Sequence, residues 1–275
     1  PLAAAHLAIS ASRVFVGTSE RLQIYPRLPA GTDPGTPVQR KVLPRLNLVT
    51  GQGAVQVAQD HADRSVLWPV EVVDPTSPQL GAPFDTGVDG DLVVQGTLGA
   101  MVDLQGVLQL VDLTDPSQPA LAGRYEKEGL LFGDAFLAGD LLVLEILTDA
   151  VALTLLDVSD PQAPRRITAL REYGTLAVGE GLLVCRRNTR VILYDVSDPE
   201  RPKEASRPGV RGRVLDAVVA DGHLHVLTEI GPGLATVQSL DVTDPGDPQP
   251  RATVTLPRYA TALAKGAAAA LSGSG

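Results

Sequence analysis

The feature that most constrains the fold of this chain is a short motif, Asp-Pro-x-x-Pro, which occurs six times. The copies begin at Asp33, Asp74, Asp115, Asp160, Asp198 and Asp244 and are 41, 41, 45, 38 and 46 residues apart. A period of about 42 residues is that of one four-stranded blade of a β-propeller. In all copies but the first, an acidic residue stands three positions before the motif: Glu71, Asp112, Asp157, Asp195 and Asp241.

The chemistry of the motif predicts a turn followed by an edge strand. An Asp at the first turn position can accept hydrogen bonds from N–H groups two or three residues on, and the next Pro presets φ. The second Pro has no N–H to give to a sheet, so it is tolerated where an edge strand begins. We therefore predict structural turn roles, not catalytic ones, for Asp112, Asp115, Asp157, Asp160, Asp195, Asp198, Asp241 and Asp244.

Each repeat also contains four short segments rich in Val, Leu and Ile, which favour strands. In the fifth repeat they are "TLAVG", "LLVCRR", "VILYDVS" and "KEASRP". Two-residue turns are expected at Gly139-Asp140, Gly179-Glu180 and Asp221-Gly222. The predicted fold is an all-β propeller of four-stranded antiparallel blades, forming a single domain over residues 1–275. The complete repeats are 7–46, 47–83, 84–128, 129–173, 174–210 and 211–258.

The number of blades depends on the final segment. Residues 259–275 match the first two strands of another repeat. A propeller must close to remove its exposed strand edges. Seven blades are favoured, with the last one incomplete in this chain. The alternative is six blades, with the final segment added to a neighbouring element.

Composition excludes some partners and reactive groups. A net charge of −9 and a pI near 4.9 argue against nucleic acid, whose phosphates need a concentrated basic surface. No apolar run is long enough for a transmembrane helix. The single cysteine, Cys185, lies in an apolar run and is expected to be a buried hydrophobe, not a nucleophile. No cofactor or nucleophile motif is present, so no cofactor is expected.

The best candidate for ligand binding is "RRNTR", with Arg186, Arg187, Asn188 and Arg190. It is predicted to link the second and third strands of repeat five. Guanidinium groups there could hold a carboxylate or a phosphate. As a loop residue, Arg187 should be replaceable by Ala with little change in stability. The links between blades share this face, and they carry the further candidates Arg211, Arg213, Arg258 and Tyr259.

Two other patterns can be interpreted either as structural or as functional. His223 and His225 share one face of a predicted strand and could ligate a metal, but no third ligand is evident, so a structural pair is favoured. Residues 60–64, "DHADR", contain an Asp and a His that could support general-base catalysis. A solvated loop is the favoured interpretation. Asp89-Gly90 is expected to form a hairpin turn.

Four repeats carry a recognisable sequence: "LVDLTDPSQP", "LLDVSDPQAP", "LYDVSDPERP" and "LDVTDPGDP". They resemble the LVIVD repeat of bacterial and archaeal β-propellers, and the resemblance covers about residues 7–258. Members of that family are often secreted or attached to the cell surface. The resemblance therefore implies a propeller placed outside the cytoplasm.

Two functions remain open at this point. The first is a non-catalytic extracytoplasmic scaffold that presents a loop-rich face to a protein or an envelope glycan. The alternative is a hydrolase or lyase with a site at the mouth of the central channel, an idea based on analogy of fold. Three or more polar side chains converging from different inner strands would favour the enzyme.

Overall fold

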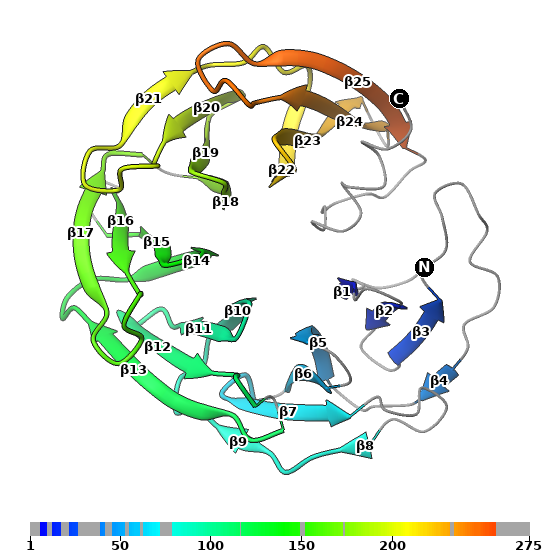
Figure 1. Cartoon of the computed structure of the whole chain (residues 1–275), viewed down its shortest axis with the longest axis vertical. Coiled ribbons are helices and arrows are strands. Elements are labelled where there is room, and N and C mark those ends of the chain that lie inside the picture. The colour runs from blue at the N-terminus through cyan, green and yellow to red at the C-terminus, as the bar shows by residue number, and fades with distance from the viewer. Residues whose placement is uncertain are drawn as a thin grey trace. The chain divides into compact units, whose positions relative to one another are not determined.

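A computed structural model of the chain consists of β-strands, turns and connecting segments in the residues that it describes (Figure 1). None of the described segments is a helix that could cross a membrane. The described residues are 6–9, 13–17, 22–26, 39–41, 46–52, 55–60, 63–71, 79–115, 117–148, 152–172, 174–231 and 234–256.

The described strands form six antiparallel sheets that follow one another along the chain. The first two contain β1 (His6–Ile9), β2 (Arg13–Gly17), β3 (Leu22–Pro26) and β4 (Gln39–Lys41), then β5 (Leu46–Gln52), β6 (Val55–Asp60), β7 (Val66–Glu71), β8 (Gln79–Leu80) and β9 (Phe84–Asp85). The next two contain β10 (Asp91–Gln95), β11 (Leu98–Val102), β12 (Val107–Asp112) and β13 (Ala120–Glu126), then β14 (Phe132–Ala138), β15 (Leu141–Ile146), β16 (Ala152–Asp157) and β17 (Arg165–Leu170). The last two contain β18 (Thr175–Gly179), β19 (Leu182–Arg187), β20 (Arg190–Asp195) and β21 (Lys203–Ser206), then β22 (Arg213–Ala220), β23 (His223–Gly231), β24 (Leu234–Asp241) and β25 (Gln249–Leu256).

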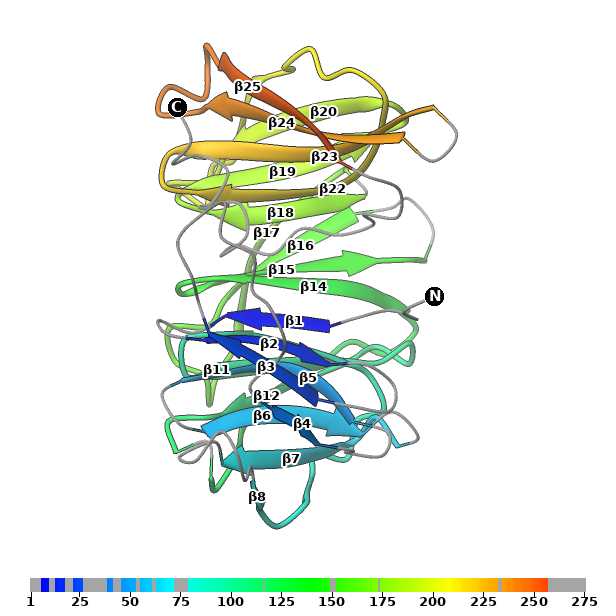
Figure 2. The same cartoon turned by 90° about the vertical axis from the view of Figure 1, so that its right-hand side faces the viewer.

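Strands pair in chain order within each sheet, except that β9 pairs with β7; Figure 2 shows the sheets from the side. The strand after each described Asp-Pro turn lies at the edge of its sheet, where the second Pro predicts it. The second sheet differs from the expected repeat boundary, because Phe84 and Asp85 still pair with its strand β7. Its outer strand is split around residues 81–83, where Pro83 has no N–H to donate.

The Asp-Pro turns contain the hydrogen bonds expected of them. The Asp198 carboxylate accepts from the N–H of Glu200 at 3.2 Å, and its carbonyl accepts from the N–H of Arg201 at 3.0 Å. The same pair of bonds, two and three residues on, occurs at Asp115, Asp160 and Asp244. The Asp therefore accepts hydrogen bonds from N–H groups of the turn that have no partner in the edge strand.

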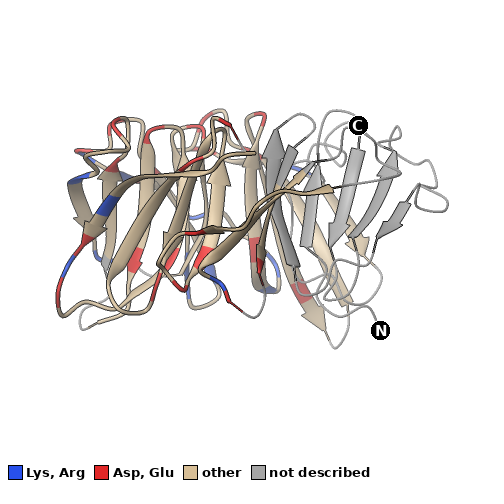
Figure 3. Cartoon of the chain, turned by 90° about the horizontal axis from the view of Figure 1, so that it is seen from below, with Lys and Arg blue, Asp and Glu red and all other residues tan. Residues whose placement is uncertain are grey.

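The acidic residue three positions earlier makes a second, similar turn. Asp195 accepts from the N–H and the hydroxyl of Ser197 at 2.9 and 2.6 Å, and these bonds lower its pKa. Asp241 also forms an ion pair with Arg251 of the outer strand at 2.6 Å. Asp157 pairs with Arg165 at 3.0 Å. These acidic residues thus stabilise the turn and anchor the fourth strand. Figure 3 shows all described Asp and Glu residues in red.

The tight turns between first and second strands follow the expected chemistry, with one shift. Gly139-Asp140 joins β14 to β15, and Asp221-Gly222 joins β22 to β23. Between β18 and β19 the turn residues are Glu180 and Gly181, one position later than the expected Gly179-Glu180. Their φ angles of 54° and 76° suit a type I′ hairpin.

The chain divides into two compact units, residues 1–135 with 158–164 and residues 136–157 with 165–275. The first unit has an apolar core that includes Leu67 of β7, Met101 of β11 and Val111 of β12. The single-domain assignment and the seventh blade stay predictions, and residues 257–275 lie outside the described residues.

In the second unit, the β18–β21 sheet packs between its two neighbours. Leu183 and Cys185 of β19 pack on the β14–β17 sheet through Val143. On its other face, Val184 packs on the β22–β25 sheet with Val226. Alternate residues of β19 thus enter two different cores, because successive side chains of a strand point to opposite faces of the sheet.

Polar side chains at the fifth position of the second strand connect these packed sheets. The Glu145 carboxylate of β15 accepts from the N–H of Thr175 in the next sheet at 2.6 Å. One repeat later, the Arg186 guanidinium of β19 donates to the carbonyl of Val214 at 2.9 Å. Arg186 is therefore held between two sheets.

Candidate functional site

The candidate site is built on the hairpin between β19 and β20. Arg187 and Arg190 are opposite each other in the ladder, and Asn188 and Thr189 form the turn. Asn188 has a φ of 58°, a left-handed conformation that Asn tolerates better than most residues. The turn is thus shorter than "RRNTR" suggests, and its arginines lie on strand ends.

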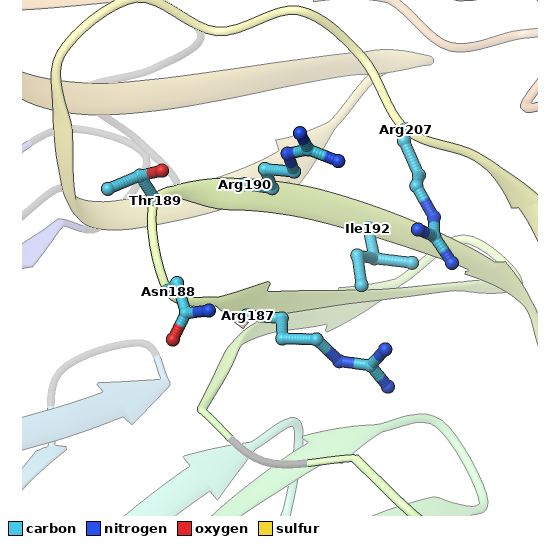
Figure 4. Close-up of a pocket in the computed structure, with 6 residues that line it drawn as sticks. All are labelled: Arg187, Asn188, Thr189, Arg190, Ile192 and Arg207. Atoms are coloured by element: carbon cyan, nitrogen blue, oxygen red, sulfur yellow. The ribbon is translucent and has the colours of Figure 1, made fainter.

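A cavity of about 270 Å³ lies beside this hairpin, lined by Arg187, Asn188, Thr189, Arg190, Ile192 and Arg207. Arg187 comes from β19, Arg190 and Ile192 come from β20, and Arg207 directly follows β21. Figure 4 shows Ile192 between the side chains of Arg187 and Arg207. The pocket thus combines three guanidinium groups with one apolar side chain, and we call it the arginine pocket.

A buried carboxylate holds one of the three arginines. Glu172 lies in the segment before β18 and is 3% exposed. Its carboxylate accepts from both Nε and Nη2 of Arg187, the Nε bond measuring 3.2 Å, and from the Tyr194 hydroxyl at 2.6 Å. Burial, together with the bond to Glu172, raises the pKa of Tyr194. Arg187 is therefore a partner of a buried acid, which argues against the expectation that it can be removed without loss of stability.

The second arginine is paired at the surface. Nε and Nη2 of Arg207 donate to the Glu204 carboxylate at 2.6 and 2.8 Å. Hydrogen bonding to Arg207 lowers the pKa of Glu204. The third arginine, Arg190, is exposed and has no ion-pair partner among the described residues. The arginine pocket therefore carries one positive charge that no described carboxylate offsets.

The other predicted binding residues do not line this pocket. Arg213 forms an ion pair with Glu229 at 2.8 Å. Arg211 is held through its backbone, which exchanges two hydrogen bonds with the side chain of Gln238. Arg258 and Tyr259 lie outside the described residues. Of the predicted set, the structure thus brings together Arg187, Asn188 and Arg190, to which it adds Thr189, Ile192 and Arg207.

The cysteine beside this cluster is buried. Cys185 is fully buried on the face of β19 that packs on the β14–β17 sheet. Burial, with smaller contributions from the charges of Glu172 and Glu145, raises the pKa of its thiol to about 12. At neutral pH the thiolate population is negligible, so Cys185 packs as a hydrophobe in the folded chain.

The two histidines of β23 have separate partners. Nδ1 of His225 lies 2.7 Å from the Ser239 hydroxyl, and the ring is fully buried. Nδ1 of His223 lies 2.7 Å from the carbonyl of Asp221. Burial lowers the pKa of His225. Among the described residues, no group of three potential metal-binding side chains is present.

Arg64, just before β7, connects to the segment that leads into β10. Arg64 pairs with Asp89 at 3.3 Å and with Asp91 at 3.2 Å. Asp89-Gly90 is not a hairpin turn, because it leads from the second sheet into β10. Gln59 fixes this connection by donating to the carbonyl of Gly90 at 2.6 Å. His61 lies outside the described residues.

No family model and no curated protein matches the sequence. Among solved structures, the chain is similar to a protein from Lactobacillus plantarum (12% identity, TM-score 0.66, 95% of this chain and 89% of that one). It is also similar to Hsv2 from Kluyveromyces lactis (11% identity, TM-score 0.59, 88% and 76%). The chain has the β-propeller fold. The computationally designed Ika8 protein is a further structural neighbour (11% identity, TM-score 0.62, 96% and 91%). At these identities the similarity extends to the fold alone.

Proposed function

We propose that this propeller is a non-catalytic binding scaffold and that its arginine pocket holds an anionic group of a partner. The observation that carries the proposal is the state of the three guanidinium groups. Arg187 and Arg207 are fixed by Glu172 and Glu204, and Arg190 is free to pair. The unpaired guanidinium group of Arg190 is therefore the one suited to planar, bidentate recognition of an anion.

The chemistry of the lining supports binding over catalysis. An arginine does not release its proton near neutral pH, and the side chains of Asn, Thr and Ile do not titrate there either. The Glu172 carboxylate already accepts from Arg187 and Tyr194. The Glu204 carboxylate accepts from Arg207. A general acid or base would need a group with a pKa near the working pH. The pocket lining supplies none.

We further propose that the scaffold works outside the cytoplasm and that its partner is a protein or a component of the cell envelope. This placement is supported only by the resemblance of the repeats to the LVIVD repeat. Loops positioned by a rigid framework are a common way to present a binding site.

An affinity pull-down from envelope extract tests the proposal, with retained material identified by mass spectrometry. The wild-type chain is compared with Arg190→Gln and with the control Arg201→Gln. Arg201 is also an exposed arginine, but it lies in an Asp-Pro turn. Retention by wild type and by Arg201→Gln, but not by Arg190→Gln, supports the proposal. Equal retention by all three chains contradicts it.

A further inference from the structure

We infer that the partner is an acidic protein segment that places one carboxylate in the arginine pocket and apolar side chains on either side of it. The inference rests on the proposed function, because it names the occupant of the same pocket. Three observations carry it: the charge of the pocket, the exposed apolar residues near it, and the aromatic residues of the second unit.

The charge of the pocket matches a carboxylate better than a phosphate. Two of its three guanidinium groups are already neutralised, by Glu172 and Glu204. Arg190 therefore leaves one positive charge. A carboxylate carries one negative charge, whereas a phosphate monoester carries about −1.5 to −2 at pH 7. Ile192 in the lining suits the aliphatic stem of an Asp or Glu side chain.

Exposed apolar residues lie on the same edge of the second unit as the pocket. In each four-stranded antiparallel sheet, the hairpin between the second and third strands lies at one end. Three such connections, from β15 to β16, from β19 to β20 and from β23 to β24, belong to sheets that pack on one another. Stacked sheets are about 10 Å apart, so their hairpins lie within reach of one short segment.

The outer two hairpins carry the apolar side chains. Leu147, just after β15, is 50% exposed, and Ile230 and Leu234, beside the β23–β24 turn, are 47% and 43% exposed. They lie on either side of the hairpin that carries Arg190. Arg is enriched at protein interfaces, and the exposed apolar side chains on either side of it can be buried by a bound peptide.

The aromatic residues of this unit disfavour a glycan. Sugar rings are commonly bound by stacking on exposed aromatic side chains. Among the described residues of the second unit, Tyr194 is buried and Phe136 is partly buried against the core. No aromatic side chain described there is exposed. Leucine and isoleucine cannot donate hydrogen bonds to sugar hydroxyls, but they can bury the apolar side chains of a peptide.

Fluorescence anisotropy with labelled synthetic probes tests the inference. The main probe is a peptide with one Glu between two Leu, each separated from it by one Ala. Matched probes replace Glu by Gln, Glu by phosphoserine, or both Leu by Ala, and a labelled oligogalacturonate supplies carboxylates without apolar side chains. The chains are wild type, Arg190→Gln and Ile230→Ser, with Arg201→Gln and Leu121→Ser as exposed control variants.

The expected result is that the main probe binds wild type most tightly. Arg190→Gln should weaken its binding about tenfold or more, and Ile230→Ser several-fold, while both control variants bind as wild type does. Tighter binding of the phosphoserine peptide, or of oligogalacturonate, overturns the inference if it depends on Arg190, but leaves the proposed function intact. If no probe binds in an Arg190-dependent way, both the inference and the proposed function fail.

Discussion

At the scale of single residues, the arginine pocket depends on an ion pair between a buried carboxylate and a partly exposed guanidinium group. The Glu172 carboxylate is almost inaccessible to water and is satisfied by Arg187 and Tyr194. A buried carboxylate that loses its partner is costly, whereas an exposed arginine contributes little. Arg187 and Arg190 are neighbours across one hairpin, yet their side chains have different roles.

Replacing Arg187 by Ala should lower the free energy of unfolding by about 1–3 kcal/mol, because Glu172 loses its main donor. Replacing Arg190 by Ala should change it by less than about 0.5 kcal/mol. Urea denaturation of both variants measures the difference. Adding Glu172→Gln to Arg187→Ala should recover part of the loss. Equal stability of the two single variants would contradict this account of Glu172.

Replacing Asp198 by Ala should lower the free energy of unfolding by about 1–2 kcal/mol, because the turn loses a carboxylate that accepts a backbone hydrogen bond. Asp134→Ala is the control, since Asp134 is an exposed residue of strand β14 outside the Asp-Pro turns. Thermal denaturation compares the two variants. If both melt at the wild-type temperature, the Asp-Pro motif does not stabilise the turn.

The sequence predicted these roles unevenly. The Asp-Pro turns depend on bonds within five residues, so the spacing of Asp195 and Asp198 was enough to predict them. The arginine pocket depends on residues that are 15–22 positions apart in sequence, such as Glu172 with Arg187 and Tyr194. Their contact is set by the path of the link before β18 and by strand register, which composition does not encode. Arg207 could have been found by extending the register of the third and fourth strands, because Leu193 is opposite Ser206 and the next pair is Ile192 with Arg207.

At the scale of strands and sheets, the fourth strand of one sheet packs against the Asp-Pro turn of the next, and this contact limits the distance between the two sheets. The Ser206 hydroxyl of β21 donates to the carbonyl of Pro245 in the next Asp-Pro turn at 2.6 Å. Two sheets earlier, Gly123 of β13 occupies the position of Ser206, because each is the fourth residue of its strand. A Cβ at Gly123 would lie 2.0 Å from the carbonyl oxygen of Pro161. Backbone packs on backbone there, so only glycine fits.

Replacing Gly123 by Ala should therefore destabilise the chain by about 1–3 kcal/mol through overpacking. Gly209→Ala is the matched control, because Gly209 has no neighbouring atom within 4 Å of the added Cβ. Its free energy of unfolding should stay within about 0.5 kcal/mol of wild type. Urea denaturation measures both, and a neutral Gly123→Ala variant would show that the turn at Pro161 can move away.

The strand pattern was predictable because each sheet is made of consecutive segments, whereas two details were not. The turn at Glu180-Gly181 is displaced by one residue, since either Gly179 or Gly181 could have supplied the glycine of a two-residue turn. The outer strand of the second sheet is divided at residues 81–83, where sequence alone suggested the end of a repeat.

At the scale of the whole molecule, stability should depend on pH in two separate ranges. His225 is buried and its pKa is lowered, so the unfolded chain binds a proton that the folded chain does not. Its contribution is complete above pH 6.5 and is lost as pH falls below that value. The lowered pKa values of Asp112, Asp195 and Asp241 act in the same direction below about pH 4.

Urea denaturation between pH 3 and 8 should show both losses of stability. The variant His225→Val with Ser239→Leu copies the pair found at the same register in the preceding sheet, Val184 with Leu193. It should remove the loss between about pH 6.5 and 5 and keep the loss below pH 4. Unchanged dependence above pH 5 would mean that His225 does not control the upper range.

The central claim is that one free arginine on a rigid propeller hairpin binds a carboxylate. The most direct measurement is an NMR titration with propionate, at constant ionic strength, following the side-chain Nε–Hε signals of Arg190 and Arg201 in wild type. The account predicts a saturable shift of the Arg190 signal and none of the Arg201 signal. Small, parallel, unsaturated shifts of both signals would contradict it, because they would reflect only nonspecific attraction of anions to exposed guanidinium groups.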